Sequence, residues 1–224
     1  MRTTLVDEIQ RAALDALAAG YQPIPVPYRS KNPARYGWQD ERRVLEDGLF
    51  DFCEGENIGN LNGEPSGGLV DVDLDAEEAI EAASEFLSET LMIHGRGSKP
   101  RSHFWYISDP SPKTRQWTDV NGNMLVELRS TGTQTVLPPS MHPEGERLEW
   151  YANGKPGQVD PDHLVSACTW IAISSILARH WPNVGARHHL ANAMAGFLIR
   201  KELDVALIAK IVKTSAQVAN DDEW

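Results

Sequence analysis

The first fifty residues combine helical and extended spacings of apolar positions. Residues 1–20, MRTTLVDEIQRAALDALAAG, place apolar residues three or four positions apart, which predicts an amphipathic helix. Residues 21–28, YQPIPVPY, alternate with proline and predict a short edge strand, because proline cannot donate a ladder hydrogen bond. Residues 39–52, QDERRVLEDGLFDF, return to helical spacing. We therefore expect a helix, a strand and a second helix.

The middle of the chain is dominated by short extended segments. Turn-forming residues 56–68 lead into LVDVDLD, residues 69–75, and residues 76–91 then have the spacing of a helix. Further extended segments are expected at residues 102–108, 117–130, 133–140 and 147–154. The N-G pair inside residues 117–130 predicts a hairpin turn. This part of the chain is therefore predicted to be mixed α and β.

The pattern becomes helical from about residue 161. Three helical segments are expected at residues 162–181, 183–202 and 204–224, with a break at Pro182 and an N-cap at Asp204. We place a domain boundary here, with one domain at residues 1–160 and a helical one at residues 161–224. The chain stops just after an apolar helix, so we expect it to be part of a longer protein.

Composition narrows the class of protein. The formal net charge of −11 argues against a surface covered with basic residues, although residues 94–115 hold five Lys or Arg and one acid, which allows a local basic groove. No apolar run reaches the roughly 20 residues that cross a bilayer, and residues 1–20 lack a secretory signal pattern. Cys53 and Cys168 form no metal or disulfide motif. We expect both cysteines to be reduced, no membrane partner and a cytoplasmic location.

Three aspartates crowd one short stretch. Asp71, Asp73 and Asp75 stand at alternate positions, so an extended chain would place their carboxylates on one face, while Val72 and Leu74 face the core. Like charges in such a row repel one another unless a cation or a basic group neutralises them. The pattern therefore predicts a positive partner at this site.

Other interpretations of this stretch compete with a metal site. Asp75 could cap the following helix with Glu78 as its partner, but this leaves the two earlier aspartates unexplained. A calcium loop of the EF-hand type would need glycine where Ala76 stands and glutamate where Ala82 stands. A D-x-D pair on a strand instead suits Mg²⁺ or Mn²⁺, which take carboxylate and phosphate oxygens.

Residues 94–107, HGRGSKPRSHFWYI, allow two interpretations. They form either a solvated glycine-rich loop before a core strand or a phosphate-binding segment. Glycines free backbone N–H groups, and the neighbouring hydroxyl, cationic and imidazole groups suit a triphosphate. The candidate nucleotide-binding residues in this segment are Ser98, Lys99, Arg101, Ser102 and His103.

Glu127 and Arg129 form a third candidate group, since they share one face of an extended segment. One interpretation is a structural ion pair across the sheet. The other is that Glu127 joins the aspartates as a further metal carboxylate while Arg129 faces phosphate. Trp105 and Trp117 are either core residues or platforms that stack a base.

These three segments, in this order, resemble motifs of the archaeo-eukaryotic primase superfamily, and most closely the bifunctional DNA primase/polymerase N-terminal domain of phages, plasmids and mobile elements. Residues 57–75 resemble its glycine-rich approach and hydrophobic D-x-D, residues 98–106 its small-residue-and-histidine motif, and residues 126–150 its acidic third motif with proline-proline-serine. The resemblance covers roughly residues 5–160. The later helices are similar to the segment that often leads toward a helicase.

The resemblance implies an α+β primase (prim-pol) catalytic fold, with mixed sheets and flanking helices, followed by a small C-terminal helical bundle. It implies two Mg²⁺ or Mn²⁺ ions at the site. The pair that holds them is Asp73 and Asp75 when the pattern is anchored on the following helix, or Asp71 and Asp73 when it is anchored on the preceding glycines. The implied catalytic residues are Asp73, Asp75, Glu127 and His103, with Asp71 as an auxiliary ligand and Arg129 among the nucleotide-binding residues.

The implied function is template-directed nucleotidyl transfer in the replication of a phage or mobile element. Its partners would be a dNTP or NTP, a single-stranded DNA template, a primer and a helicase domain in a longer chain. Two alternatives stay open at this point. One is a metal-dependent nuclease or phosphohydrolase, which would use a similar group of acids to activate water. The other is a non-catalytic nucleic-acid-binding module.

Overall fold

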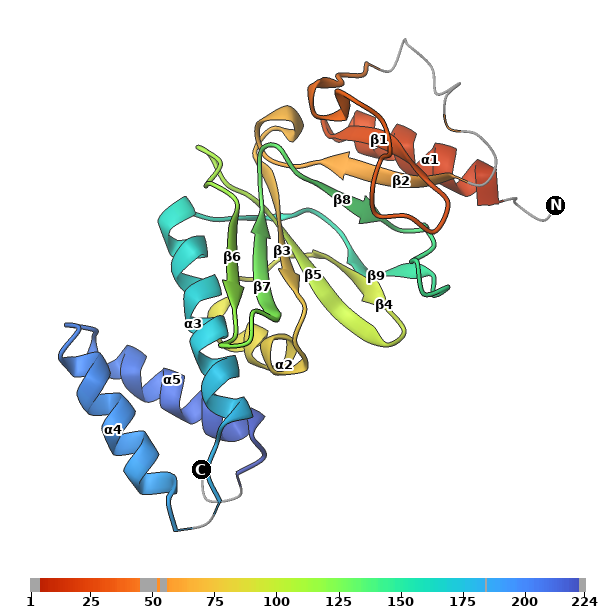
Figure 1. The fold of residues 1–224 in the computed structure, drawn as a ribbon. Helices are drawn as coiled ribbons and strands as arrows, with labels where there is room; N and C mark the ends of the chain where they lie inside the picture. Colours follow the sequence, from red (N-terminus) through yellow and green to blue (C-terminus); the bar gives the residue numbers. More distant parts are fainter. Residues whose placement is uncertain (1–4, 45–51, 53–55, 184, 222–224) are drawn as a thin grey trace. The chain divides into compact units, whose positions relative to one another are not determined.

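The computed structural model describes residues 5–44, 52, 56–183 and 185–221 of the chain, and Figure 1 labels α1 to α5 and β1 to β9. The elements before residue 90 are α1 (Leu5–Ala18), β1 (Gln22–Pro27), the short helix η1 (Trp38–Asp40), β2 (Glu56–Leu61), η3 (Glu64–Ser66), β3 (Leu69–Leu74) and α2 (Glu77–Phe86). The strands that follow are β4 (Met92–Arg96), β5 (Lys99–Ile107), β6 (Arg115–Thr118), β7 (Met124–Arg129), β8 (Gln134–Leu137), β9 (Leu148–Asn153) and β10 (Gly157–Gln158). The last helices are α3 (Pro161–Arg179), α4 (Arg187–Ile199) and α5 (Val205–Val218). This mixed α and β architecture agrees with the predicted class.

A three-stranded antiparallel sheet has the order β1-β2-β8, and α1 packs against β1 and β2 (Figure 1). The proline-rich strand β1 lies at its edge, as predicted, because a proline has no N–H to offer a second neighbour. The sheet buries apolar side chains on both faces. One face contributes Ile58 and Leu137 to a core that contains Trp105, and the other contributes Leu61 and Val136.

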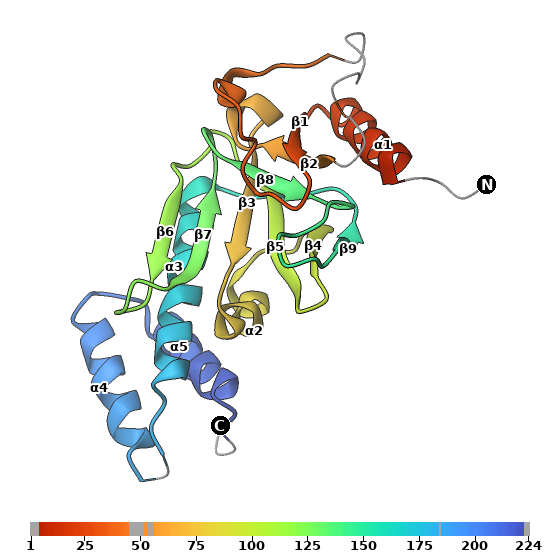
Figure 2. The same cartoon turned by 45° about the vertical axis from the view of Figure 1, so that its right-hand side comes forward.

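The larger sheet has the strand order β6-β7-β3-β5-β4-β9, and β10 adds to β5 in parallel. Strands β3, β5, β4 and β9 pair antiparallel with one another, and Figure 2 shows these strands side by side. The predicted strands at residues 102–108, 133–140 and 147–154 and the hairpin around Asn121 and Gly122 are all present. The sheet therefore aligns the aspartate strand β3 with the histidine strand β5.

One prediction about local structure is wrong, and one open interpretation is refined. Residues 41–44 are not helical, although a helix was expected over residues 39–52, of which residues 45–51 lie outside the described residues. In residues 94–107, for which a glycine-rich loop before a strand was one interpretation, β4 and β5 form a hairpin whose turn is only Gly97 and Ser98. Gly95 allows this close pairing, since a Cβ atom there would lie 2.3 Å from the Lys99 carbonyl oxygen and 2.7 Å from the Arg101 nitrogen.

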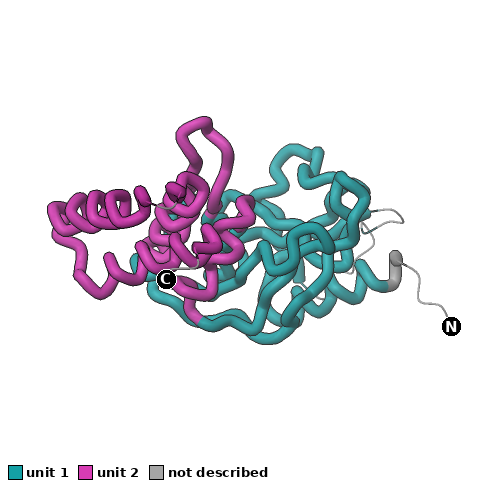
Figure 3. Tube along the Cα trace, turned by 90° about the horizontal axis from the view of Figure 1, so that it is seen from below, with its two compact units in different colours: residues 1–73, 89–115, 128–163 teal, residues 74–88, 116–127, 164–224 magenta. Residues whose placement is uncertain are grey.

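The chain divides into two compact units, coloured in Figure 3. The first comprises residues 1–73, 89–115 and 128–163, and the second comprises residues 74–88, 116–127 and 164–224. Neither unit is a single stretch of chain. The expected division at residue 160 remains a prediction about domains.

The second unit is held together by contacts between distant parts of the chain. The Arg179 guanidinium of α3 donates to both carboxylate oxygens of Glu78 in α2, at 2.9 Å each, and to Asp119 Oδ2 at 2.8 Å. Asp204 caps α5, as predicted, by accepting hydrogen bonds from the backbone of Ala206 and Leu207.

Cys168 is a free buried thiol, and burial raises its pKa to about 12. No helix in the described part of the chain is long and apolar enough to cross a membrane.

Candidate active site

Strand β3 carries Asp71 and Asp73 on one face, while Val72 and Leu74 occupy the other and are fully buried. The alternation predicted for this stretch is therefore present. Asp75 lies one residue beyond the strand and is half-buried. It is not a helix cap, because α2 has Ala76 at its N-cap and no side-chain capping bond.

A row of paired residues crosses the sheet at the level of Asp73. Asp73 pairs with His103 on β5, His103 pairs with His94 on β4, and His94 pairs with Trp150 on β9. Residues that pair directly across antiparallel strands point to the same face, so these four side chains share one side of the sheet. The register thus brings an acid and two imidazoles together from positions 73, 94 and 103.

His103 lies between the two aspartates. Its Nδ1 is 3.0 Å from Asp71 Oδ2, and its Nε2 is 3.6 Å from Asp73 Oδ1, which is beyond hydrogen-bond length. Burial alone would lower the pKa of His103, but the carboxylates of Asp73 and Asp71 and the hydrogen bond to Asp71 outweigh burial, so its pKa is raised. A protonated His103 can therefore hold Asp71 with one nitrogen and keep Nε2–H for another acceptor.

His94 lies fully buried beneath His103, with ring centroids 4.3 Å apart and planes 3° from parallel. The indole N–H of Trp105 donates to His94 Nδ1 at 2.9 Å, so this nitrogen is unprotonated. Burial and the positive charge of His103 hold the pKa of His94 well below its usual value. His94 therefore acts as a neutral support for His103. Trp105 is itself fully buried in the core, which favours the core interpretation over base stacking.

Asp71 is completely buried and is fixed by residues of both sheets. Its Oδ2 accepts a hydrogen bond from Thr135 Oγ1 of β8 at 2.8 Å, in addition to the bond with His103. Its Oδ1 is also buried and accepts no hydrogen bond from the described residues. A buried carboxylate oxygen without a donor is costly, so this oxygen suits a bound ion or water.

Asp73 is nearly buried and is surrounded by positive charge. Arg129 Nη2 of β7 lies 2.5 Å from Asp73 Oδ2. Burial raises the pKa of Asp73, but the charges of His103, Arg129, Lys31 and Lys99 together outweigh burial, and the pKa is lowered. With His103 protonated, four cationic groups act on this place against two carboxylates. The site therefore favours a further anion.

The predicted nucleotide-binding residues do not all lie at this site. Lys99 and Arg129 act on Asp73, as does His103. Ser102 is buried on β5, and the alternation of the strand puts it on the face opposite to His103. The Arg101 guanidinium lies over the Tyr151 ring, 5.3 Å from its centroid. Ser98 bonds to Glu146, as described below. The assignments of Ser98, Arg101 and Ser102 to the nucleotide remain predictions.

Asp75 and Glu127 belong to the second unit. The backbone N–H of Asp75 donates to the Leu125 carbonyl at 3.0 Å. Glu127 is half-buried on β7, and its Oε1 accepts a hydrogen bond from Gln116 Nε2 on β6 at 2.7 Å. Arg129 forms an ion pair with Asp73. That Asp75 and Glu127 join Asp73 as metal ligands remains a prediction.

The chemistry of Asp71 and Asp73 fits a hard divalent cation, because both offer carboxylate oxygens and Asp71 Oδ1 lacks a donor. Within residues 5–44, 52, 56–183 and 185–221, no group of three or more His, Cys, Asp or Glu side chains is arranged to hold a metal ion. A metal bound here would therefore take further oxygens from water or substrate.

Several residues of the site had no signal of their own in the sequence. Thr135 lies in a strand whose pattern indicates only extension, and Lys31 lies in a loop. The Lys31 carbonyl is held by Gln134 Nε2 at 2.6 Å, more than one hundred residues along the chain. His94 lies within residues 94–107, for which phosphate binding was one interpretation. Its pairing with His103 could be identified only from the strand register.

Comparison with known proteins gives one family. The chain matches the family described as bifunctional DNA primase/polymerase, N-terminal, over residues 13–164. A search of curated proteins found no match. The matched range contains Asp71, Asp73, His103 and Arg129, together with both sheets.

Proposed function

The chain belongs to the bifunctional DNA primase/polymerase family, and on this premise we propose that it catalyses template-directed nucleotidyl transfer as a DNA primase and DNA polymerase. Membership implies primase or polymerase activity in general, with nucleotide and DNA substrates. The observation that carries the proposal is the group formed by Asp71, Asp73, His103 and Arg129 on one sheet face. It joins acidic oxygens, suited to metal ions, with cations suited to phosphate.

The family is in general dependent on divalent metal ions. In this chain Asp71 and Asp73 would hold Mg²⁺ or Mn²⁺, and we propose Asp75 and Glu127 as further ligands of a two-ion site. When bound, the ions supply Lewis acidity, which favours ionisation of the primer 3′-hydroxyl and neutralises the phosphates. Thr135 and His103 orient Asp71 by their hydrogen bonds, so its carboxylate is fixed before substrate arrives.

The cationic residues bind and orient the triphosphate. His103 is placed to donate Nε2–H to a phosphate oxygen, since Nδ1 is engaged by Asp71 and Nε2 is too far from Asp73 for a hydrogen bond. Lys31 and Lys99 add positive charge at the same place. Arg129 neutralises Asp73 in the free protein and can turn to phosphate once a metal ion takes that role.

We further propose that the protein serves replication of a phage or mobile element in the cytoplasm of its host, on a single-stranded DNA template. A helicase domain in a longer chain would supply that template. The net charge of −11 argues that this part of the protein binds DNA weakly and in a salt-sensitive way.

A primer-extension assay tests the proposal. A labelled primer on a DNA template is incubated with Mg²⁺ or Mn²⁺ and with dNTPs or NTPs, using the native chain, Asp73→Asn and the matched surface control Asp15→Asn, in which an exposed acid of α1 is changed. Extension is expected for the native chain and the control. Its loss in Asp73→Asn by at least about 100-fold is expected, because the variant removes an oxygen ligand with its charge.

The same assay separates the alternatives. Shortening of the primer with release of nucleotides would favour the nuclease interpretation. Unchanged DNA binding without any product, in a folded native chain supplied with metal and nucleotide, would favour the non-catalytic module and would count against the proposal. Circular dichroism of each variant establishes that the loss of product does not come from unfolding.

A further inference from the structure

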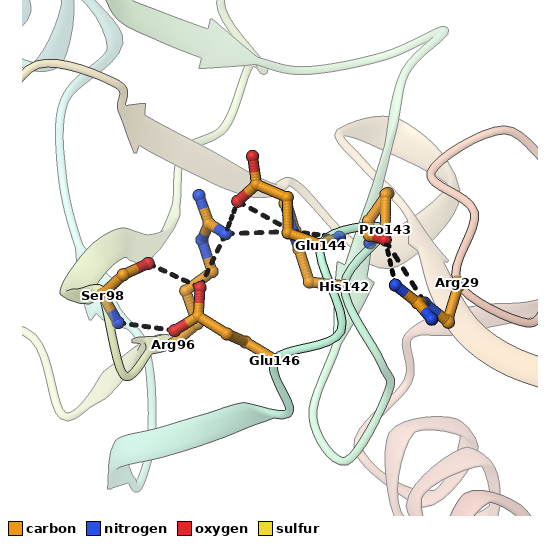
Figure 4. Close-up of polar contacts among 7 residues, drawn as sticks. All are labelled: Arg29, Arg96, Ser98, His142, Pro143, Glu144 and Glu146. Atoms are coloured by element: carbon orange, nitrogen blue, oxygen red, sulfur yellow. Dashed lines mark hydrogen bonds and ion pairs between the residues drawn. The ribbon is translucent and has the colours of Figure 1, made fainter.

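The turn between β4 and β5 holds a carboxylate in the way a phosphate is held. The backbone N–H of Ser98 donates to Glu146 Oε2 at 2.7 Å, and its hydroxyl donates to Glu146 Oε1 at 2.6 Å (Figure 4). Arg96 Nη1 lies 2.8 Å from the same Oε1. One backbone donor, one hydroxyl and one guanidinium thus converge on two oxygens of a single anion.

Gly97 makes room for this anion. A Cβ atom at position 97 would lie 3.2 Å from Glu146 Oε2, closer than side chains normally pack, and apart from the adjoining residues Arg96 and Ser98 no other described atom lies within 4 Å of it. The absence of a side chain therefore lets an oxyanion approach the Ser98 N–H. A carboxylate that only pairs with an exposed side chain would not need a glycine at position 97.

Residues 142–146, which we call the strap, bring two carboxylates to the single guanidinium of Arg96. Arg96 contacts both Glu144 and Glu146, and it also lies 3.1 Å from His142 Nδ1. Burial and the charges of Lys31 and Arg96 lower the pKa of His142, so the ring adds no balancing charge at neutral pH. Two carboxylates thus share one guanidinium, so release of Glu146 would leave Arg96 paired with Glu144.

The strap is anchored apart from its acidic side chains. Arg29 donates to the Pro143 carbonyl from Nη2 at 2.7 Å and from Nε at 3.3 Å (Figure 4). The Glu144 side chain is 66% exposed and that of Glu146 is 32% exposed. Ion pairs with such exposure contribute little to stability, so Glu146 can leave Ser98 while the strap backbone stays in place.

The turn lies close to the candidate active site. Arg96 and Lys99 pair across the same hairpin that pairs His94 with His103. His103 and Lys99 lie four residues apart on β5, which is roughly 13 Å at the usual rise. The charge of Lys31 acts on both Asp73 and His142. A polyphosphate or a nucleic-acid strand at Asp73 is therefore long enough to reach Ser98.

We propose that Ser98, Gly97 and Arg96 form a phosphate-binding site that the carboxylate of Glu146 fills in the free protein, and that a phosphate group displaces this carboxylate. The phosphate comes from a nucleotide or from a DNA backbone, since both present the same oxyanion. Only this choice of source rests on the proposed function. The site itself is defined by its donors and by its internal competitor.

Binding measured in EDTA, without turnover, tests the site. The probes are inorganic tripolyphosphate and a labelled oligothymidylate, and the proteins are the native chain, Glu146→Gln and Glu149→Gln. Glu149 is an exposed acid of the neighbouring strand β9, so its variant changes the net charge equally without touching the turn. Glu146→Gln is expected to bind at least one probe about three- to tenfold more tightly than Glu149→Gln.

A double variant that also removes the hydroxyl donor of the site provides the decisive control. In the double variant Ser98→Ala/Glu146→Gln the gain is expected to disappear, because the hydroxyl donor is lost. Equal affinities of Glu146→Gln and Glu149→Gln for both probes, or a gain that survives in the double variant, would overturn the proposal. A gain for tripolyphosphate alone indicates a nucleotide source, and a gain for the oligonucleotide alone indicates the DNA backbone.

The native chain supplies a test that needs no variant. In a ¹⁵N-labelled sample the Ser98 amide is expected to shift on titration with whichever probe binds, while the amide of Glu149 is not. A Ser98 amide that stays unchanged while a probe binds elsewhere contradicts the site. Primer extension is measured separately, so an inactive chain that still gains affinity in Glu146→Gln separates failure of the proposed function from failure of this site.

Discussion

The imidazole rings of His94 and His103 stack face to face, 4.3 Å between centroids and 3° from parallel. Two charged imidazoles would repel each other strongly at this distance, so one proton is favoured on the pair. It resides on His103, next to Asp71 and Asp73, while Trp105 donates to the neutral His94. The stack therefore keeps the cation at the sheet face where substrate would bind.

His94 is predicted to weaken the fold in acid. Its pKa is well below its usual value in the folded chain, so below about pH 6.5 the unfolded state takes up a proton that the folded state does not. His94→Gln keeps an acceptor for the Trp105 N–H but does not titrate. Its unfolding free energy should fall less steeply between pH 6.5 and pH 5, by up to about 1.4 kcal/mol per pH unit.

Urea unfolding at several pH values measures this difference, and His163→Gln, a change of an exposed histidine in α3, is the control.

The contribution of His103 to the unfolding free energy has the opposite pH dependence, because its pKa is raised. This contribution is full below the unfolded pKa and is lost as pH rises through the folded pKa. His103→Gln should therefore alter the alkaline side of the stability profile. Acid profiles of the native chain and His94→Gln with identical slopes would refute the neutral assignment of His94.

Arg129→Gln is predicted to make stability depend on metal ions. Removing the guanidinium leaves Asp73, only 4% exposed, without the partner 2.5 Å away, and the metal-free chain should lose about 3 kcal/mol. Mg²⁺ or Mn²⁺ should restore part of this loss by binding the carboxylate. The measurement is the rise in Tm on adding metal, expected to be larger for the variant than for the native chain.

Arg147→Gln is the matched control, because Arg147 pairs with Glu8 and is 45% exposed. It should show the same small response to metal as the native chain. Equal metal responses in Arg129→Gln and Arg147→Gln would argue against a divalent ion at Asp73.

Thr135→Val is predicted to destabilise the protein at nearly constant volume. The variant removes the hydroxyl that donates to the buried Asp71 carboxylate at 2.8 Å, and the expected loss is about 1–3 kcal/mol. Chemical denaturation measures it. Thr118→Val, which changes an exposed threonine of β6, should leave the unfolding free energy within about 0.5 kcal/mol of the native value. A similar small effect at Thr135 would mean that its hydroxyl does not stabilise Asp71.

Gly95→Ala is predicted to disturb the β4–β5 hairpin. The added Cβ atom would meet backbone atoms of Lys99 and Arg101, which cannot move without shifting the strand pairing, so a loss of about 1–3 kcal/mol or more is expected. In Gly196→Ala the same change inside α4 should be neutral or stabilising, because alanine favours helices. Thermal unfolding of both variants checks the prediction, and a stable Gly95→Ala would contradict the close approach.

The sequence predicted the parts of this site that depend on local periodicity. The alternation around Asp71 and Asp73 indicated a strand with acids on one face, and the aromatic run after Ser102 indicated the strand that carries His103. Their adjacency could be expected from the family resemblance but not from either segment alone. Local patterns define elements, whereas pairing between elements depends on the whole chain.

The remaining contacts depend on distances in sequence that no local pattern encodes. Ser98 meets Glu146 across 48 residues, and Thr135 meets Asp71 across 64. The shift of register between His94 and Arg96 also decides which residues of β4 pair with which residues of β5. The prediction of a helix at residues 39–52 failed for a related reason. The helical spacing of these residues says nothing about the contacts that leave residues 41–44 non-helical.

Arg179 also bears on how the gene could be shortened or recombined. This residue near the end of α3 binds Glu78 and Asp119, which were synthesised long before it. An expression product that stops at residue 160 would retain these two acids and lack the guanidinium that joins them. Attempts to obtain a minimal enzyme should therefore keep α3, and exchange of the C-terminal helices with a relative should carry over partners for both acids.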